Sequence, residues 1–184
     1  MKFLKWLIII LLLLLGLSFV GFKIAFNQTK KHSPETTVSY KQNGLDVAII
    51  YSRPFKKERE IFGGLVPYGK VWRTGANEAT IFRTKTDLMV DGNFLPAGEY
   101  TLWTLPNESS WEVIFNRGEY FWGVNSKSEA SREADLDVLN IKAKVQKTFK
   151  IVEQFTIEIE RTPPVLSFKW DDIVVEIPLN AKSE

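Results

Sequence analysis

Four polar residues could form a binding site for a small anion: Arg53, Arg73, Asn77 and Glu78. Arginine guanidinium groups hold carboxylates and phosphates through paired hydrogen bonds. Gly75 would let backbone N–H groups approach a ligand, and the side chains at positions 77 and 78 could orient that ligand. If both arginines converge on one cleft, they would form a cationic pocket. We therefore expect ligand binding within residues 51–80.

The same residues also have a purely structural interpretation. Arg73 could pair with Glu78 or another carboxylate, while Gly75 supplies a turn and Asn77 satisfies the loop backbone. Arg53 precedes Pro54, which would end a strand because proline cannot continue the ladder. Gly63 and Gly64 fit a tight turn better than an anion-binding nest. Both interpretations remain open from the sequence.

Residue types that are scarce in the chain exclude several classes of chemistry. There is no cysteine, and the one histidine, His32, precedes the expected domain. A Ser-His-Asp triad, a histidine-ligated zinc site and thiolate chemistry therefore have no candidates inside the domain. No spacing predicts a metal site or a cofactor. Carboxylate chemistry remains, because Glu58, Glu60 and Glu78 could supply the acid pair of a glycosidase.

Other residues with chemical potential have simpler explanations. Asp171 and Asp172 lack a calcium-loop pattern, and we expect a turn there. Tryptophans on alternating strands are mostly core residues, so we expect at most one or two to be exposed, which argues against a sugar-binding platform. The tryptophans concerned are Trp72, Trp103, Trp111, Trp122 and Trp170.

The elements that must position these residues are mostly strands. Residues 45–51 are rich in strand-forming types, and apolar and polar residues alternate in residues 139–145, 155–160 and 167–170. Ile173, Val175 and Ile177 continue the period of two. Asn43-Gly44, Asp91-Gly92 and Pro106-Asn107 predict turns between neighbouring strands. Within the domain that follows an N-terminal transmembrane helix, helix is expected only at residues 126–135 and 56–61. The pattern predicts an all-β fold of nine or ten strands, an antiparallel β-sandwich or jelly-roll-like domain, with a closed or flattened barrel as the alternative.

The N-terminal segment predicts a membrane association. Residues 6–22 are uncharged and apolar, and at ~1.5 Å per residue they span about 26 Å, close to the thickness of a hydrocarbon core. Bulky residues follow where a signal cleavage site needs small ones, which favours an uncleaved signal-anchor over a cleaved secretory signal. We expect a cytoplasmic segment at 1–5, a transmembrane signal-anchor at 6–25, a tether at 26–36 and the β-domain at 37–180.

Charge is unevenly distributed along the chain. Five of the 24 lysines and arginines precede residue 33, whereas all 22 acidic residues follow it, so residues 33–184 carry a net charge of −3. A slightly acidic domain lacks the positive surface that phosphate-backbone binding requires, which excludes nucleic acid as an expected partner. About 150 residues bury roughly 70% of the unfolded surface, enough for one core.

The motifs of the domain also resemble a known family. Ser52-Arg53-Pro54, Pro67-Tyr68-Gly69, residues 72–80 (WRTGANEAT) and Pro96-Ala97-Gly98 closely resemble the bacterial domain of unknown function 2911 family, over residues 38–178. Because members typically follow an export signal, the resemblance implies an extracytoplasmic domain. It implies no activity and names no catalytic residue.

Taken together, the sequence predicts a single-pass membrane protein of the bacterial cell envelope whose extracytoplasmic β-domain binds a small anionic or carbohydrate-like ligand, or an envelope partner, without catalysis. Secretion after signal cleavage is the alternative location. A carboxylate-dependent hydrolase of envelope sugars and a purely structural envelope protein are the alternative functions. A hydrolase requires two facing carboxylates in one pocket.

Overall fold

The computed structural model describes residues 2–182, which divide into two compact units. The first unit is Met1–His32 and the second is Ser33–Glu184. The first unit consists of a helix, and the described strands all belong to the second.

The first unit is α1, which spans Lys2–His32. Most large apolar side chains of residues 3–24 are exposed, a pattern that is typical of a helix made for a nonpolar surrounding. Phe3–His32 is long and apolar enough to cross a membrane, and an N-terminal signal sequence meets the same criterion. α1 is therefore a signal sequence or an anchor. Most of the residues predicted as a tether are helical, since α1 continues to His32.

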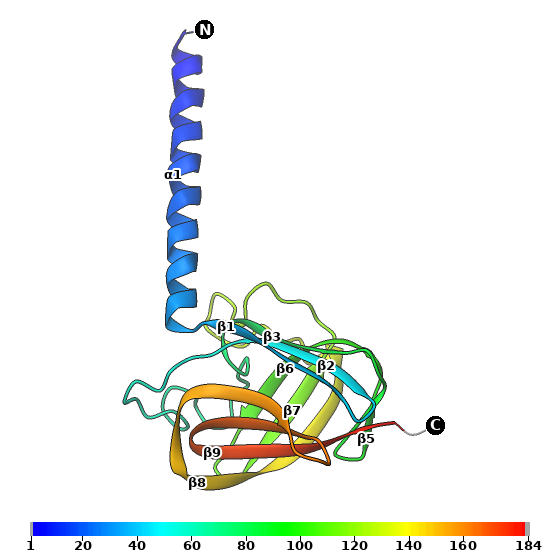
Figure 1. Cartoon of the computed structure of the whole chain (residues 1–184). Coiled ribbons are helices and arrows are strands. Elements are labelled where there is room, and N and C mark those ends of the chain that lie inside the picture. Colours follow the sequence, from blue (N-terminus) through cyan, green and yellow to red (C-terminus); the bar gives the residue numbers. More distant parts are fainter. Residues whose placement is uncertain (1, 183–184) are drawn as a thin grey trace. The chain divides into compact units, whose positions relative to one another are not determined.

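The second unit contains one antiparallel sheet with the strand order β1-β2-β3-β6-β7-β8-β9-β4-β5. Figure 1 shows that this sheet is strongly curved. The strands are β1 Glu35–Gln42, β2 Leu45–Ser52, β3 Ala76–Thr84, β4 Leu88–Val90, β5 Asn93–Leu95, β6 Gly98–Pro106, β7 Ser110–Asn116, β8 Asp137–Glu160 and β9 Val165–Ala181. The prediction of a mostly β, antiparallel fold is confirmed. The sheet is not closed, because β1 and β5 are its edges.

The predicted hairpin turns are confirmed. Asn43 and Gly44 have φ values of 53° and 77°, and Asp91 and Gly92 have 47° and 76°. Positive φ at both central residues gives a turn whose twist matches the flanking strands. The third turn follows Pro106, where the N–H of Asn107 donates to the carbonyl of Ser110 at 3.1 Å. These turns connect β1 to β2, β4 to β5 and β6 to β7.

The C-terminal strands differ from the prediction. The four segments predicted as separate strands form two long ones, β8 and β9. The turn predicted at Asp171-Asp172 is wrong, because both residues lie inside β9. Asp171 has a φ of 55°, and the β8–β9 pairing shifts register opposite it. A bulge uses the same residue types as a turn, which explains the error.

Both predicted helices are also wrong. Residues 56–61 form turns, with positive φ at Lys57 and Glu58. Residues 126–135 are mostly turns and irregular structure, followed by a short 3-10 helix at Ala134–Leu136. Ser128 has a φ of 62°, which no α-helix accommodates. The helix-forming composition of these segments lacked an apolar stripe to bury, so tertiary packing did not favour a helix.

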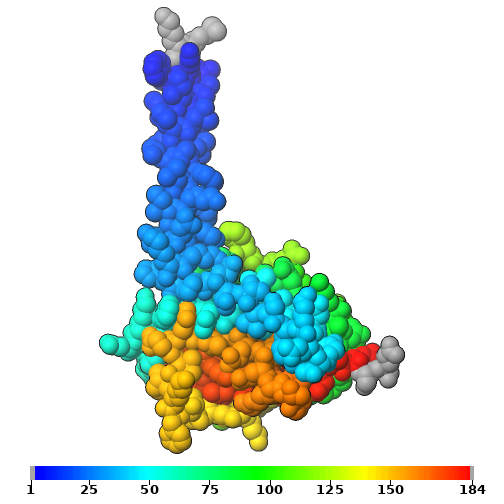
Figure 2. Space-filling view, viewed as in Figure 1, coloured from blue at the N-terminus to red at the C-terminus, as the bar shows by residue number. Residues whose placement is uncertain are grey.

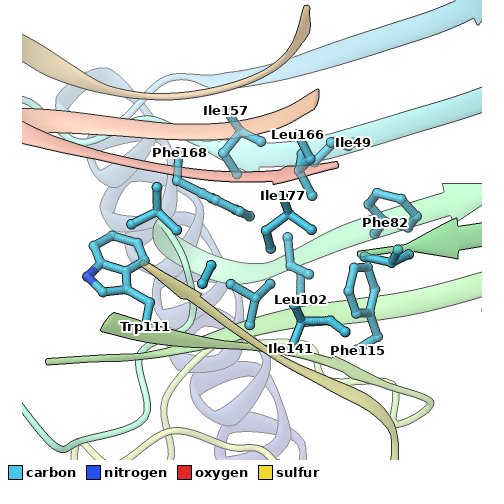
Figure 3. Packing of buried hydrophobic residues seen from close by; sticks show 14 of the residues in the cluster. Ile49, Phe82, Leu102, Trp111, Phe115, Ile141, Ile157, Leu166, Phe168 and Ile177 are labelled. Atoms are coloured by element: carbon cyan, nitrogen blue, oxygen red, sulfur yellow. The ribbon is translucent and has the colours of Figure 1, made fainter. Parts of the chain in front are cut away.

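The core lies on one face of the curved sheet. In β2 the residues alternate between buried and half-buried, with Val47 and Ile49 fully buried. Figure 3 shows side chains from β2, β3, β6, β7, β8 and β9 pointing into one cluster. The tryptophan prediction is confirmed, because Trp103, Trp111 and Trp170 are buried and the other two are half-buried.

Opposite parts of the sheet are joined by direct hydrogen bonds. The hydroxyl of Tyr51 on β2 donates to the carbonyl of Ile157 on β8 at 3.2 Å and accepts from its N–H at 2.7 Å. The ring of Tyr51 also packs edge-on against Phe155. Burial raises the pKa of this phenol, so it stays protonated and can donate.

Candidate functional site

The candidate site is a pocket of about 730 Å³ beside the segment that leads into β3. We call it the Arg73 pocket. Two separate parts of the chain line it. One wall consists of Leu65, Val66, Pro67, Lys70, Val71, Trp72 and Arg73, and the other of Val124, Lys127, Ser128, Glu129, Ala130 and Arg132.

The first wall is fixed to the sheet by backbone hydrogen bonds. The N–H of Trp72 donates to the carbonyl of Thr104 on β6 at 2.7 Å, and the reverse bond measures 3.0 Å. Upstream, Gly63 lies in a turn, with φ of 92°, and donates to the carbonyl of Val66 at 2.9 Å. The expected turn at Gly63 is therefore confirmed. Arg73 thus extends from backbone that the sheet holds in place.

The loop between Arg73 and β3 is tightly closed. Thr80 Oγ1 donates to the carbonyl of Thr74 at 2.7 Å, and Trp72 Nε1 donates to the carbonyl of Gly75 at 3.1 Å. Gly75 has a φ of 153°, and a Cβ there would lie 2.9 Å from the carbonyl oxygen of Ser52. Only glycine fits this position without displacing the backbone. The role of Gly75 is therefore to allow the turn that precedes β3.

The second wall is a loop held by the side chain of Asn125. Its Oδ1 accepts from the N–H groups of Lys127 at 2.9 Å and Glu129 at 3.1 Å. The loop is anchored at Gly123, whose N–H donates to the carbonyl of Asn77 at 3.0 Å and whose carbonyl accepts from Ser131 at 3.2 Å. These bonds bring residues 124–132 opposite Arg73, although the sequence separates the two walls widely.

Arg73 is the unusual residue of this pocket. Its Nε is buried and has no hydrogen-bond partner, and no carboxylate pairs with its guanidinium among residues 2–182. Loss of solvation on burial lowers the pKa of Arg73. Buried donors are almost always satisfied in folded proteins, so an unsatisfied one on a charged group requires an explanation.

The charges around Arg73 are mostly positive. Lys70 and Lys127 line the pocket and are exposed, and Glu129 is the one carboxylate among its lining residues. Arg132 is neutralised by Asp137, to which its Nε donates at 2.8 Å. Desolvation opposes ionisation of Asp137, but hydrogen bonds from Arg132 and Asn116 outweigh it and lower the pKa of Asp137. A cationic pocket thus lies in a domain whose net charge is −3.

Arg53 lies apart from this pocket. Its Nε donates to the carbonyl of Phe155 at 3.1 Å, and its Nη2 donates to Thr156 Oγ1 at 2.8 Å. Arg53 lines a second pocket, of about 680 Å³, which shares no lining residue with the first. The structure therefore does not bring the two arginines into one cleft, and Arg53 connects the end of β2 to β8.

Asn77 and Glu78 do not line the Arg73 pocket either. Asn77 is buried, with a φ of 61°, and its carbonyl holds Gly123 in the second wall. Glu78 Oε2 accepts a hydrogen bond from Ser52 Oγ at 3.4 Å, which joins β3 to β2. Of the four predicted site residues, Arg73 alone lines the pocket. Asn77 contributes indirectly, because its carbonyl binds Gly123 at the start of the second wall.

Sequence reasoning missed the second wall of the pocket. Lys127 and Arg132 fell within a segment predicted as a helix, so their charges were not placed opposite Arg73. The available signal was Gly123, since a glycine followed by Asn125 is typical of a loop.

The remaining chemical candidates are ion-paired or isolated. Asp171 pairs with Lys56 Nζ at 2.5 Å, and Asp172 pairs with Lys147 at 3.2 Å, so neither is arranged around a cation. Within residues 2–182 no group of three or more histidine or acidic side chains could hold a metal ion. The Arg73 pocket has a single lining carboxylate, which does not provide the acid pair of a glycosidase.

Comparison with known proteins gives one family. The model of the family described as "Protein of unknown function (DUF2911)" matches residues 33–179, which is nearly the whole second unit. Neither the curated proteins nor the solved structures gave a match.

Proposed function

Because the chain belongs to the DUF2911 family, whose description assigns no activity, we propose from the site itself that the domain binds a small organic anion in the Arg73 pocket. The ligand carries a carboxylate or phosphate group, and the domain binds it without chemical conversion. The proposal places Arg73 in direct contact with that group. Asn77 is a positioning residue, and Arg53 and Glu78 hold strands together.

One observation carries the proposal, namely the unpaired Nε of Arg73. A structural arginine would be paired, as Arg53 is with Phe155 and Thr156. A ligand anion in the pocket would compensate for the desolvation of the guanidinium, whose charge no carboxylate within residues 2–182 neutralises. Lys70 and Lys127 would add attraction at the pocket mouth, which raises association rates more than affinity.

The pocket also has an apolar part. Val66, Val71, Trp72 and Val124 line it together with the charged groups. A site with mixed lining favours a ligand that has an apolar body beside its anionic group. The hydrolase alternative has less support, because the lining of the Arg73 pocket offers one carboxylate. In the second pocket, two of the three lining carboxylates are ion-paired, Glu158 with Lys169 and Glu176 with Arg161.

The proposal also covers α1 and the boundaries of the domain. We take α1 as an uncleaved anchor, with residues 1–5 cytoplasmic, 6–25 in the membrane, 26–36 as the tether and 37–180 as the extracytoplasmic domain. In this view the curved sheet forms a sandwich by folding over its own core. An intact mass for the chain extracted from membranes would support the anchor, whereas a soluble form lacking the first 25 or so residues would establish a cleaved signal.

The test of binding compares Arg73→Met with Arg53→Met in the full chain in detergent. Melting temperatures are measured by circular dichroism with phosphate, acetate and a panel of phosphomonoesters and uronic acids. A ligand at about 100 times its Kd stabilises a domain by about 2.7 kcal/mol, which shifts melting by roughly 5–10 °C.

We expect the wild type and Arg53→Met to show this shift and Arg73→Met to lose it. Both variants remove one positive charge, so the comparison separates the pocket from general electrostatics. If no anion shifts the wild type, or if Arg73→Met keeps the shift, the proposed function is wrong.

A further inference from the structure

The middle of β8 contains a second feature that anion binding does not explain. β8 bends there, and its pairing with β9 shifts register between Lys147 and Val152 and again before Thr156 (Figure 1). We call residues 147–152 the β8 bend. Figure 2 shows β8, in gold and orange, forming much of the visible surface of the second unit. The bend is therefore available to a partner.

Two large apolar side chains of the β8 bend are exposed. Phe149 is 109% exposed and Ile151 is 53% exposed. Further along the same strand, Phe155 and Ile157 are fully buried in the core. Phe149 is the most exposed large apolar residue of the second unit. Isolated exposed apolar residues are common, but a neighbouring pair on a protruding bend indicates a contact surface.

The stretch of β8 that contains the bend is basic, whereas Glu153 follows it directly and Asp171 lies opposite Val152 on β9. Residues 142–152 contain four lysines and no acidic residue. Lys142, Lys144, Lys147 and Lys150 are all exposed, and within residues 2–182 Lys147 is the one of these four that pairs with an acid, Asp172. This positive charge stands out in a domain of net charge −3. A basic surface with aromatic and aliphatic side chains at its tip is typical of contact with anionic lipid.

We propose that the β8 bend docks on an anionic bilayer, with Phe149 and Ile151 entering the headgroup region and the lysines contacting lipid phosphates. Charge complementarity selects this partner, and α1 provides a helix long and apolar enough to bring a bilayer near the domain. A second copy of the chain is disfavoured as the occupant, because a symmetric contact would place the lysines of both copies against each other. This inference is independent of the anion pocket.

The absence of cysteine allows a direct test. Thr148→Cys places a single environment-sensitive fluorophore in the bend of the full chain, and Gln42→Cys places one on exposed β1 as the control. Each labelled chain is reconstituted at one copy per nanodisc, with zwitterionic lipid alone or with added anionic lipid. Emission and its quenching by brominated lipids are then measured.

We expect emission at position 148 to rise about two-fold or more in anionic nanodiscs, with quenching by brominated lipid, and to fall back at high salt because charge attraction is screened. Emission at position 42 should not change. Adding Phe149→Ser and Ile151→Ser, or Lys147→Gln and Lys150→Gln, to the Thr148→Cys chain should abolish the rise. These residues are outside the core, so the variants should melt as the parent does.

Three results would overturn the proposal. One is a label at position 148 that responds equally to both lipid compositions or to neither. Another is a serine variant that retains the full response. The third is a label that becomes shielded in detergent, without lipid, as protein concentration rises, since this would identify a second copy as the partner.

Discussion

Gly123 packs directly against the aliphatic part of Arg73. A Cβ at position 123 would lie 2.8 Å from Arg73 Cβ and closer still to its Cδ. The N–H of Gly123 also donates to the carbonyl of Asn77 at 3.0 Å. This contact holds the arginine side chain against the pocket wall, and it explains how a glycine far away in sequence contributes to the site.

Gly123→Ala should therefore displace Arg73 and weaken anion binding. The new methyl group cannot fit unless the arginine or the loop moves, and overpacking of this kind costs about 1–3 kcal/mol. Thermal shift with the best anion checks the loss of binding. Gly92→Asn is the control, because a Cβ there meets no atom within 4 Å and asparagine tolerates its φ of 76°. Unchanged anion binding in Gly123→Ala would contradict the proposed support.

Replacing the two arginines should change stability in opposite directions. Arg53→Met removes satisfied hydrogen bonds to Phe155 and Thr156 and should cost about 1–3 kcal/mol. Arg73→Met removes an uncompensated, desolvated charge and keeps much of the packing against Gly123. We expect it to be neutral or stabilising by up to about 2 kcal/mol without ligand. Urea unfolding measures both, and a strongly destabilised Arg73→Met would indicate a structural arginine.

Asp137→Asn should lower stability while strengthening anion binding. The variant loses the ion pair with Arg132, at a cost of about 1–2 kcal/mol at pH 7, and it leaves Arg132 as an uncompensated positive charge in the pocket lining. Urea unfolding and anion titration measure the two effects. Asp46→Asn is the control, because its pair with Lys41 is long, at 3.5 Å, and Lys41 is exposed, so its loss should change stability by less than about 0.5 kcal/mol.

The effect of Asp137→Asn should also depend on pH. The pKa of Asp137 is lowered in the folded state from the ordinary value of 3.8. Its stabilising contribution is therefore complete above the unfolded pKa and is lost as pH falls through the folded pKa. Wild type and variant should differ most above the ordinary aspartate pKa and converge as pH falls below the lowered pKa of the folded state. A difference that persists at low pH would rule out the ion pair as its cause.

Tyr51→Phe should destabilise the domain without changing anion binding. The substitution leaves the N–H and carbonyl of Ile157 without their phenol partner, and unsatisfied buried groups cost about 1–3 kcal/mol. Tyr40→Phe, which removes an exposed bond with Asn43, should have an effect below about 0.5 kcal/mol. Equal effects of the two substitutions on urea unfolding would show that the β2–β8 connection contributes little.

Local sequence signals predicted the parts of the fold that depend on local geometry. Asn43-Gly44 and Asp91-Gly92 predicted their turns because positive φ favours these residue types wherever they occur. The turn predicted at Asp171 was wrong, since a bulge within a strand and a turn between strands both place this residue type at positive φ. The tolerance of aspartate for positive φ is a local property. The continuation of β9 beyond Asp171 depends instead on pairing with β8.

The candidate site was predictable only in part, for a related reason. The neighbouring residues in sequence, Trp72 and Gly75, were enough to make Arg73 a candidate. Whether the guanidinium of Arg73 has an acidic partner depends on which side chains the fold brings close to it. The spacing of residues in the sequence does not predict these contacts. Lys127 became part of the site because Gly123 binds the carbonyl of Asn77, a contact between distant parts of the chain. Long-range contacts of this kind also separated Arg53 from Arg73.

The stacked indole rings of Trp72 and Trp170 are an intrinsic spectroscopic probe. Their ring centroids are 5.8 Å apart with an interplanar angle of 17°, and Trp72 lies in the pocket lining next to Arg73. Indoles stacked this closely couple their electronic transitions, so a small rotation of one changes the near-ultraviolet circular dichroism of both. A ligand that rotates Trp72 should therefore change the near-ultraviolet circular dichroism of the unlabelled protein.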